Sequence, residues 1–271
     1  MKKPMIFVFL AATLFMACQK VIEIDLNSAE PQVVVEGFVD DGPGPQEIKL
    51  TYTANYFDVN EFNSVQGAIV SISDGTGFTE QLTETSKGVY ISSSLQGIPG
   101  RTYTLDILAN GKDFTSSSTM PEHATIDSTN YDYFPKTAFT VEGNYVTFYF
   151  KEITGKGHNY LFVIYQNGEI PEMTNQAGEG PFFVFEDEFF NELNFDFQFY
   201  PYPTFPGDTI VIELVSLDHE GFMFYNTLNA TLNSASGGFS ELPQNPVTNM
   251  SDGAIGYFGA VAISRDTIII N

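Results

Sequence analysis

Residues 101–118 read RTYTLDILANGKDFTSSS, and this stretch decides the fold class. Apolar Tyr103 and Leu105 alternate with polar residues, which is the period-2 pattern of a strand with one buried and one wet face. Asn110-Gly111 follows, and this pair is the strongest short hairpin signal because a type I′ turn needs positive φ at both central residues. The stretch therefore predicts two antiparallel strands joined by a tight turn.

The same alternation recurs upstream of this hairpin. Turn signals rich in Gly, Pro, Asp and Asn separate one alternating run from the next. The expected strands lie at 32–39, 46–53, 66–73, 77–84, 88–93, 101–109 and 112–118. Their number and spacing are typical of a β-sandwich.

Met120-Pro121 is the predicted boundary of this first sandwich, because proline ends strand pairing. A second set of strands begins near Ile126. Further strands are expected around 146–150, 160–165 and 210–217, and the chain closes with strands at 255–263 and 266–270. The second half is thus also β-rich.

One segment of the second half breaks the β pattern. Phe222, Tyr225, Leu228 and Leu232 fall at helical spacing, with Asp218 placed as the N-cap. We therefore predict an all-β protein with two β-sandwich-like domains in tandem, at 31–120 and 121–271, the second carrying one α-helix at about 219–234.

The N-terminus has the pattern of an export signal. A basic start, Met1-Lys2-Lys3, precedes an apolar run that ends at Ala17-Cys18, and Cys18 is the only cysteine of the chain. The run is shorter than the roughly 20 apolar residues of a membrane span. Its end resembles a bacterial lipobox. We expect a lipoprotein signal peptide at 1–17, a lipid on Cys18 and an N-terminal tether at 18–30.

Composition excludes several classes of protein. The formal charge is −23, which argues against binding to nucleic acid or docking on anionic lipid headgroups. A single cysteine cannot form an internal disulfide or a multi-cysteine zinc site. With 43% hydrophobic residues, the chain has enough apolar side chains to form a core.

The sequence shows almost no sign of a catalytic site. The sequence contains no G-x-S-x-G, H-E-x-x-H, P-loop or G-x-G-x-x-G pattern. His123, His158 and His219 are far apart, and Asp218-His219-Glu220 is better explained as a helix start than as a metal site. The acidic cluster at 186–188 is expected to be a solvated face. We predict no catalytic residues, no metal and no cofactor.

The most unusual segment is 181–205, which is dense in Phe and Tyr and contains no Lys or Arg. Two interpretations are open. Alternate rings could line the core of strands near 182–185 and 193–199, or exposed rings could form a ligand- or partner-binding surface. The candidate binding residues are Phe182, Phe183, Phe189, Phe190, Tyr200 and Tyr202.

Several blocks of the mature chain are similar to a known family. They include 31–37 (PQVVVEG), 65–72 (VQGAIVSI), 97–105 (GIPGRTYTL), 207–211 (GDTIV), 245–250 (NPVTNM) and 253–260 (GAIGYFGA). Together they resemble a Bacteroidota outer-membrane lipoprotein family of unknown function, whose genes commonly lie beside those of TonB-dependent receptors. The first half also resembles the carboxypeptidase-regulatory-like sandwich, a module without catalytic residues.

A second resemblance concerns modification. Three tripeptides that begin with Asp127, Asp208 and Asp266 resemble the O-glycosylation acceptor of Bacteroidota, which would make Ser128, Thr209 and Thr267 acceptors. Asp-Thr before a β-branched residue is also ordinary chemistry at a strand start. Both interpretations stay open at this point.

Three functions follow as hypotheses. The first, implied by the resemblance, is a lipid-anchored accessory protein of a TonB-dependent transporter, at the outer membrane and facing the cell surface. The second is a stand-alone carbohydrate- or peptide-binding surface lipoprotein. The third is a carboxylate-based hydrolase. The first is preferred, and it makes the protein a binding protein and not an enzyme.

Overall fold

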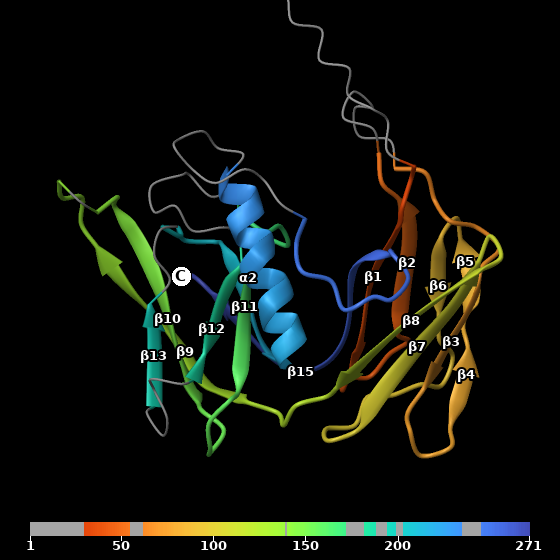
Figure 1. The fold of residues 1–271 in the computed structure, drawn as a ribbon. Helices are drawn as coiled ribbons and strands as arrows, with labels where there is room; N and C mark the ends of the chain where they lie inside the picture. The colour runs from red at the N-terminus through yellow and green to blue at the C-terminus, as the bar shows by residue number, and fades with distance from the viewer. Residues whose placement is uncertain are drawn as a thin grey trace, which may run out of the picture. The chain divides into compact units, whose positions relative to one another are not determined.

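The computed structural model describes residues 30–54, 62–138, 140–171, 182–187, 194–198, 203–234 and 245–271. The strands are β1 (Val33–Asp40), β2 (Glu47–Tyr52), β3 (Ile69–Ser73), β4 (Thr79–Gln81), β5 (Thr83–Ser86), β6 (Val89–Ile91), β7 (Thr102–Ala109), β8 (Lys112–Thr119), β9 (Thr125–Phe134), β10 (Gly143–Lys151), β11 (Asn159–Gln166), β12 (Phe183–Glu186), β13 (Asn194–Gln198), β14 (Thr209–Leu217) and β15 (Ile255–Ile269). The described helix is α2 (His219–Ser234). The predicted all-β class with one inserted helix is confirmed (Figure 1).

The first half forms a sandwich around one core. One layer contains β1, β2, β6 and β5, and the other has the order β4-β3-β7-β8. Tyr103, Leu105 and Ile107 of β7 are buried in this core, as their alternation predicts. The turn between β7 and β8 has φ of 53° at Asn110 and 74° at Gly111, which confirms the predicted hairpin.

One expected strand of this half is wrong. The run 77–84 is not a single strand, because β4 pairs with β3 in one layer and β5 pairs with β6 in the other. Leu82 lies between them, with its side chain buried and its N–H donating to the carbonyl of Val70 at 2.8 Å. The chain crosses from layer to layer at this buried leucine, which alternation alone does not reveal.

The second half has two layers of its own. The strands β12-β11-β14-β15 form one layer, and β13-β10-β9 form the other. Aromatic rings fill the space between them: the rings of Phe148 and Phe162 lie 4.7 Å apart, and those of Phe150 and Phe162 lie 5.5 Å apart. These edge-to-face contacts are a favoured geometry for buried rings.

The strand β15 belongs to both halves. Its first part, from Ile255 to Val261, pairs in parallel with β1, and its second part, from Ala262 to Ile269, pairs antiparallel with β14. The two strands expected at 255–263 and 266–270 are therefore one strand. An eight-stranded sheet results, with the order β12-β11-β14-β15-β1-β2-β6-β5, and residues 31–271 form one unit.

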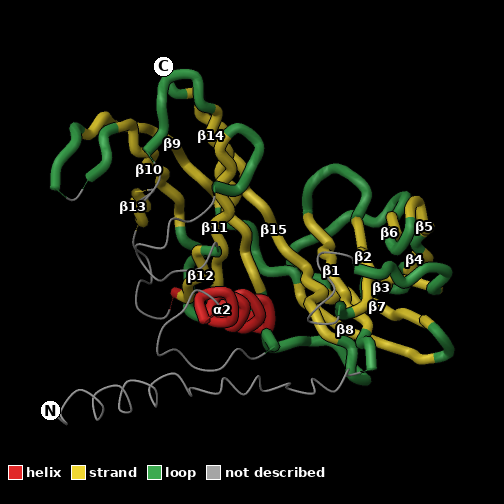
Figure 2. The backbone as a smooth tube through the Cα atoms, turned by 90° about the horizontal axis from the view of Figure 1, so that it is seen from above, coloured by secondary structure: helices red, strands yellow, loops and turns green. Residues whose placement is uncertain are grey.

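Even-numbered and odd-numbered residues of β15 face opposite sides of this sheet. Phe258, Ala260 and Ala262 belong to the core of the first half, while Tyr257 and Val261 face the helix. The helix α2 lies on that second face, packed against β11, β12, β14 and β15 (Figure 2).

Asp218 begins this helix as predicted. Its Oδ1 atom accepts a hydrogen bond from the Gly221 N–H at 2.8 Å, which is the geometry of an N-cap. With 16 residues, α2 is too short to cross a bilayer, and no other helix among the described residues is long and apolar enough to do so.

Candidate functional site

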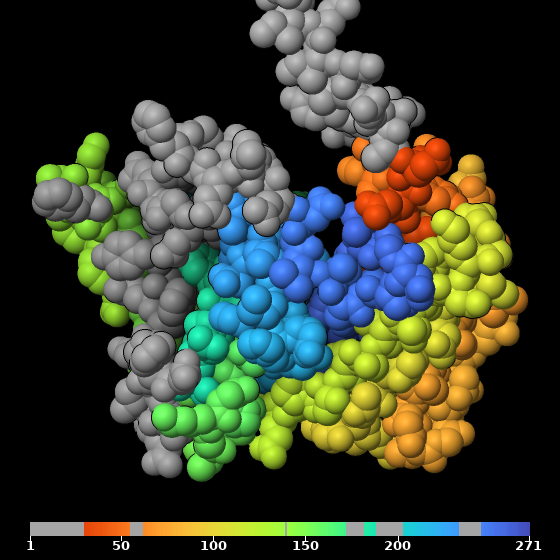
Figure 3. All heavy atoms as spheres, viewed as in Figure 1, coloured from red at the N-terminus to blue at the C-terminus, as the bar shows by residue number. Residues whose placement is uncertain are grey.

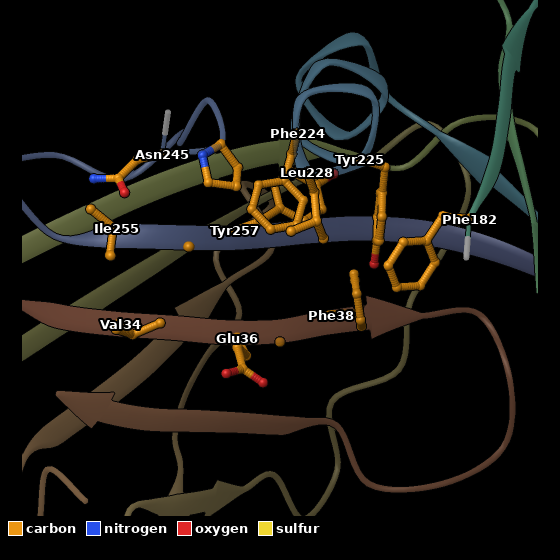
Figure 4. Close-up of a pocket in the computed structure, with 13 residues that line it drawn as sticks. Val34, Glu36, Phe38, Phe182, Phe224, Tyr225, Leu228, Asn245, Ile255 and Tyr257 are labelled. Atoms are coloured by element: carbon orange, nitrogen blue, oxygen red, sulfur yellow. The ribbon is translucent and has the colours of Figure 1, made fainter. Parts of the chain in front are cut away.

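A groove of about 400 Å³ opens on the face of the sheet where α2 lies. Its wall consists of side chains from three elements and two flanking segments (Figure 4). The lining residues are Val34, Glu36, Gly37 and Phe38 of β1, Phe224, Tyr225 and Leu228 of α2, Ile255, Gly256 and Tyr257 of β15, and Phe182, Asn245 and Pro246. The blue atoms of α2 and of the chain after residue 245 surround a hollow on this face (Figure 3).

Strand periodicity explains why β1 contributes to the groove. Val33, Val35 and Val39 point into the core of the first sandwich and are buried. The alternate residues point the other way, and Phe38 keeps 38% of its surface exposed there. A single β-strand thus supplies a core face and a groove face from one alternating pattern.

Aromatic rings make up most of the wall. The rings of Phe224 and Tyr257 are stacked, with centroids 5.2 Å apart and planes 15° apart. Phe182 meets Tyr225 edge-to-face at 5.1 Å, and Phe38 meets Tyr257 at 6.1 Å. The groove is therefore an apolar surface built on fixed rings, which is typical of small-molecule sites.

Tyr257 is fully partnered. Its hydroxyl donates to Oδ1 of Asp218 at 2.9 Å, and Ser118 donates to Oδ2 of the same carboxylate at 2.5 Å. Burial raises the pKa of Asp218, against the hydrogen bonds from Ser118, Gly221 and Tyr257, which lower it. This network joins the start of α2 to β8 and β15, so its role is structural.

Tyr225 differs from its neighbour, although their rings lie 6.2 Å apart. Only 8% of this residue is exposed, and no described residue hydrogen-bonds to its hydroxyl, which reaches the open space of the groove and is not fully buried. Burial raises the pKa of Tyr225, and the charges of Tyr165 and Glu36 add to this effect. Because this hydroxyl opens into the groove, water or a ligand can pair with it there.

We expect different results from two conservative substitutions here. Tyr225→Phe removes a hydroxyl that faces the groove and should change the free energy of unfolding by less than about 0.5 kcal/mol. Tyr257→Phe removes a donor to Asp218 and should lower it by about 1–2 kcal/mol. Urea unfolding of both variants checks this. A loss of stability in Tyr225→Phe equal to that in Tyr257→Phe would show that the Tyr225 hydroxyl is structurally engaged.

Glu36 is the only charged side chain among the described residues of the wall. Lys49 on β2 lies 3.8 Å from its Oε2 atom, with side-chain exposures of 50% for Lys49 and 59% for Glu36. Such exposed pairs are weak, at about 0–1 kcal/mol. The Glu36 carboxylate is thus available to a further cation.

The predicted aromatic binding residues that the structure describes lie in different environments. Phe182 lines the groove, and its backbone is held by Asn229 of α2. Phe183 points to the opposite side and packs against the core of the second half, as Phe185 does. Phe189, Phe190, Tyr200, Tyr202 and the lipidation candidate Cys18 lie outside the described residues.

The three candidate glycosylation residues lie on strands. Ser128 is exposed on β9, while Thr209 on β14 and Thr267 on β15 lie near each other on adjoining strands. Two of the preceding aspartates have local partners: Asp208 accepts a hydrogen bond from Asn167 at 2.8 Å, and Asp266 accepts one from Thr129 at 2.5 Å.

The polar residues considered for chemistry are dispersed. Asp187 is fully buried, so the expectation of a solvated face is wrong at this position; its Oδ1 atom accepts a hydrogen bond from the Gly157 N–H at 2.7 Å. His123 pairs with Asp41, at 2.6 Å. Within the described ranges, no three His, Cys, Asp or Glu side chains gather in a way that could hold a metal ion.

The sequence reasoning missed most of the groove. Glu36, Phe38 and Tyr257 were not singled out, and Tyr225 was noted only as part of a helical stripe. A signal was present, because β1 and β15 each carry large side chains on both faces. A strand that is apolar on both faces is covered on both, and the second cover is the helix.

The fold and the groove define a class: an all-β sandwich protein with an aromatic-walled groove on its helix-covered face. Residues 19–267 match the model of the family described as Domain of unknown function (DUF4249), and the chain belongs to this family. No curated protein matches the chain significantly.

Proposed function

We propose that this protein is a lipid-anchored accessory protein of a TonB-dependent transporter at the outer membrane, facing the cell surface, and that the groove captures ligand. The single observation that carries the binding role is the aromatic-walled groove, into which the Tyr225 hydroxyl opens without a hydrogen-bond partner among the described residues. The lipobox-like sequence at Cys18 supports the anchor. A lipid at the N-terminus leaves the folded body, with its strong negative charge, in water.

The transporter partner is tested by affinity purification of the native protein from detergent-solubilised outer membrane. We expect an outer-membrane barrel of the TonB-dependent class to co-purify in near-stoichiometric amount. Recovery of the protein without any barrel would contradict the accessory role. It would instead favour a stand-alone surface protein that binds carbohydrate or peptide.

Cys18→Ser provides the control for the anchor. This variant lacks the thiol that the lipid requires, and each buried acyl CH₂ contributes about 0.8 kcal/mol to membrane attachment. We expect the variant to be lost from the outer-membrane fraction and to recover less barrel. Unchanged membrane association of Cys18→Ser would exclude lipid as the anchor.

A further inference from the structure

The wall of the groove is mostly apolar, and Glu36, Tyr225 and Asn245 bring polar side-chain groups to it. Glu36 projects from the middle of β1, and the Tyr225 hydroxyl projects from α2 (Figure 4). Phe38, Phe182 and Leu228 supply apolar surface around them. A ligand that pairs with both Glu36 and Tyr225 has an apolar body and two polar groups.

The Tyr225 hydroxyl offers a hydrogen bond to a ligand in the groove. Phenylalanine at this position would keep the edge-to-face contact with Phe182 but would offer no hydrogen bond. The hydroxyl of Tyr257, beside it, is already used by Asp218. A hydroxyl that opens into a groove and has no partner among the described residues is available to an occupant that pairs with it.

Glu36 and the rings favour a cation at the other position. Lys49 lies 3.8 Å from Oε2 of Glu36, and both side chains are at least half exposed, so the pair competes weakly with a ligand. The faces of aromatic rings also attract cations. The formal charge of −23 on the whole chain repels an anionic ligand and attracts a cationic one.

We infer that the groove binds a small amphipathic amine: an aromatic or aliphatic body, a protonated nitrogen that pairs with Glu36, and a hydroxyl or carbonyl that hydrogen-bonds to Tyr225. The groove volume of about 400 Å³ lies within the range of small-molecule sites. This inference rests on the proposed ligand-capture function and names the chemical class of the ligand.

Four related compounds test the two polar positions separately. Tyramine has an aromatic ring, a hydroxyl and an ammonium group. Phenethylamine lacks the hydroxyl, tyrosol replaces the ammonium with a neutral alcohol, and 4-hydroxyphenylacetate replaces it with an anion. Binding is measured by calorimetry on the full-length lipoprotein in neutral phosphatidylcholine nanodiscs, with empty nanodiscs as the blank. We expect tyramine to bind about tenfold more tightly than phenethylamine or tyrosol, and the anion to bind most weakly.

Two variants link each part of the probe to its residue. Glu36→Gln should lower the affinity for tyramine about tenfold and leave that for tyrosol unchanged. Tyr225→Phe should lower the affinity for tyramine about tenfold and leave that for phenethylamine unchanged. Glu47→Gln, on the adjacent strand β2 but outside the groove wall, is the matched control and should change neither.

Three outcomes would overturn the inference: no binding of the series, equal affinity for the amine and the anion, or affinities that neither variant changes. The transporter role and the ligand class are rejected by different results. A barrel that co-purifies with a protein that binds none of the compounds would retain the transporter role and reject the ligand class. Amine binding by a protein that co-purifies with no barrel would retain the ligand class and reject the transporter role.

Discussion

Gly256→Ala should cost about 3–5 kcal/mol of unfolding free energy, enough to prevent folding of many domains. Gly256 has φ of 100°, a conformation that L side chains rarely adopt. A Cβ atom added there would lie 2.0 Å from the carbonyl oxygen of Val35, the residue that Gly256 faces across the β1–β15 pair. The backbone of β1 cannot move aside without breaking the ladder that joins the two halves.

The control for this substitution is Gly253→Ala. Gly253 also has a positive φ, of 81°, but no described atom would lie within 4 Å of an added Cβ. This variant isolates the backbone strain, at about 1 kcal/mol. Chemical unfolding of both variants, or soluble yield if Gly256→Ala does not fold, gives the comparison. Equal effects of the two substitutions would show that the close approach of β1 and β15 is not critical.

Asp218→Ala should cost about 3 kcal/mol. The substitution removes the N-cap of α2, worth about 0.5–2 kcal/mol. It also leaves the hydroxyls of Tyr257 and Ser118 without their acceptor, and a buried unpaired group adds about 1–3 kcal/mol. Urea unfolding measures the total. A cost below about 1 kcal/mol would mean that the network between α2, β8 and β15 contributes little.

Asp218→Asn is the matched variant, and the pH dependence of its free energy of unfolding provides a second test. Its amide oxygen can still accept from Gly221 and Tyr257, so we expect a loss of only about 1 kcal/mol. Burial raises the pKa of Asp218 in the folded state. The folded state therefore keeps the proton after the unfolded chain has lost it, and stability falls as pH rises from the ordinary carboxyl pKa through the raised one.

The asparagine variant has no proton to lose at this position. Its free energy of unfolding should therefore gain relative to that of the wild type as pH rises through the same window. A difference between the two proteins that does not vary with pH would show that Asp218 titrates alike in both states.

The individual strands, turns and helix of this fold are determined largely by local sequence. The hairpin at Asn110-Gly111, the cap at Asp218 and the helix 219–234 each depend on neighbours within a few residues, so alternation and turn chemistry suffice. The prediction of a single strand at 77–84 was wrong for the same reason, because a chain that changes layers at Leu82 keeps its local alternation.

The sharing of β15 could not be predicted in this way. Its pairing with β1 joins residues more than 200 positions apart, and the evidence for it in the sequence is one glycine, Gly256, whose role appears only when Val35 is placed beside it. The groove depends on that pairing, because Glu36 and Phe38 come from β1 and Tyr257 comes from β15. Of the two predicted binding residues that the structure describes, Phe182 is part of the groove and Phe183 is not.

The groove as a ligand site is tested most directly by unfolding wild-type protein and Tyr225→Phe with and without tyramine. A ligand that binds the folded state raises its stability according to its affinity. Without the amine, the variant should lie within about 0.5 kcal/mol of the wild type, and it should gain less stability when the amine is added. A variant that gains as much as the wild type would contradict the assignment of Tyr225 to ligand binding.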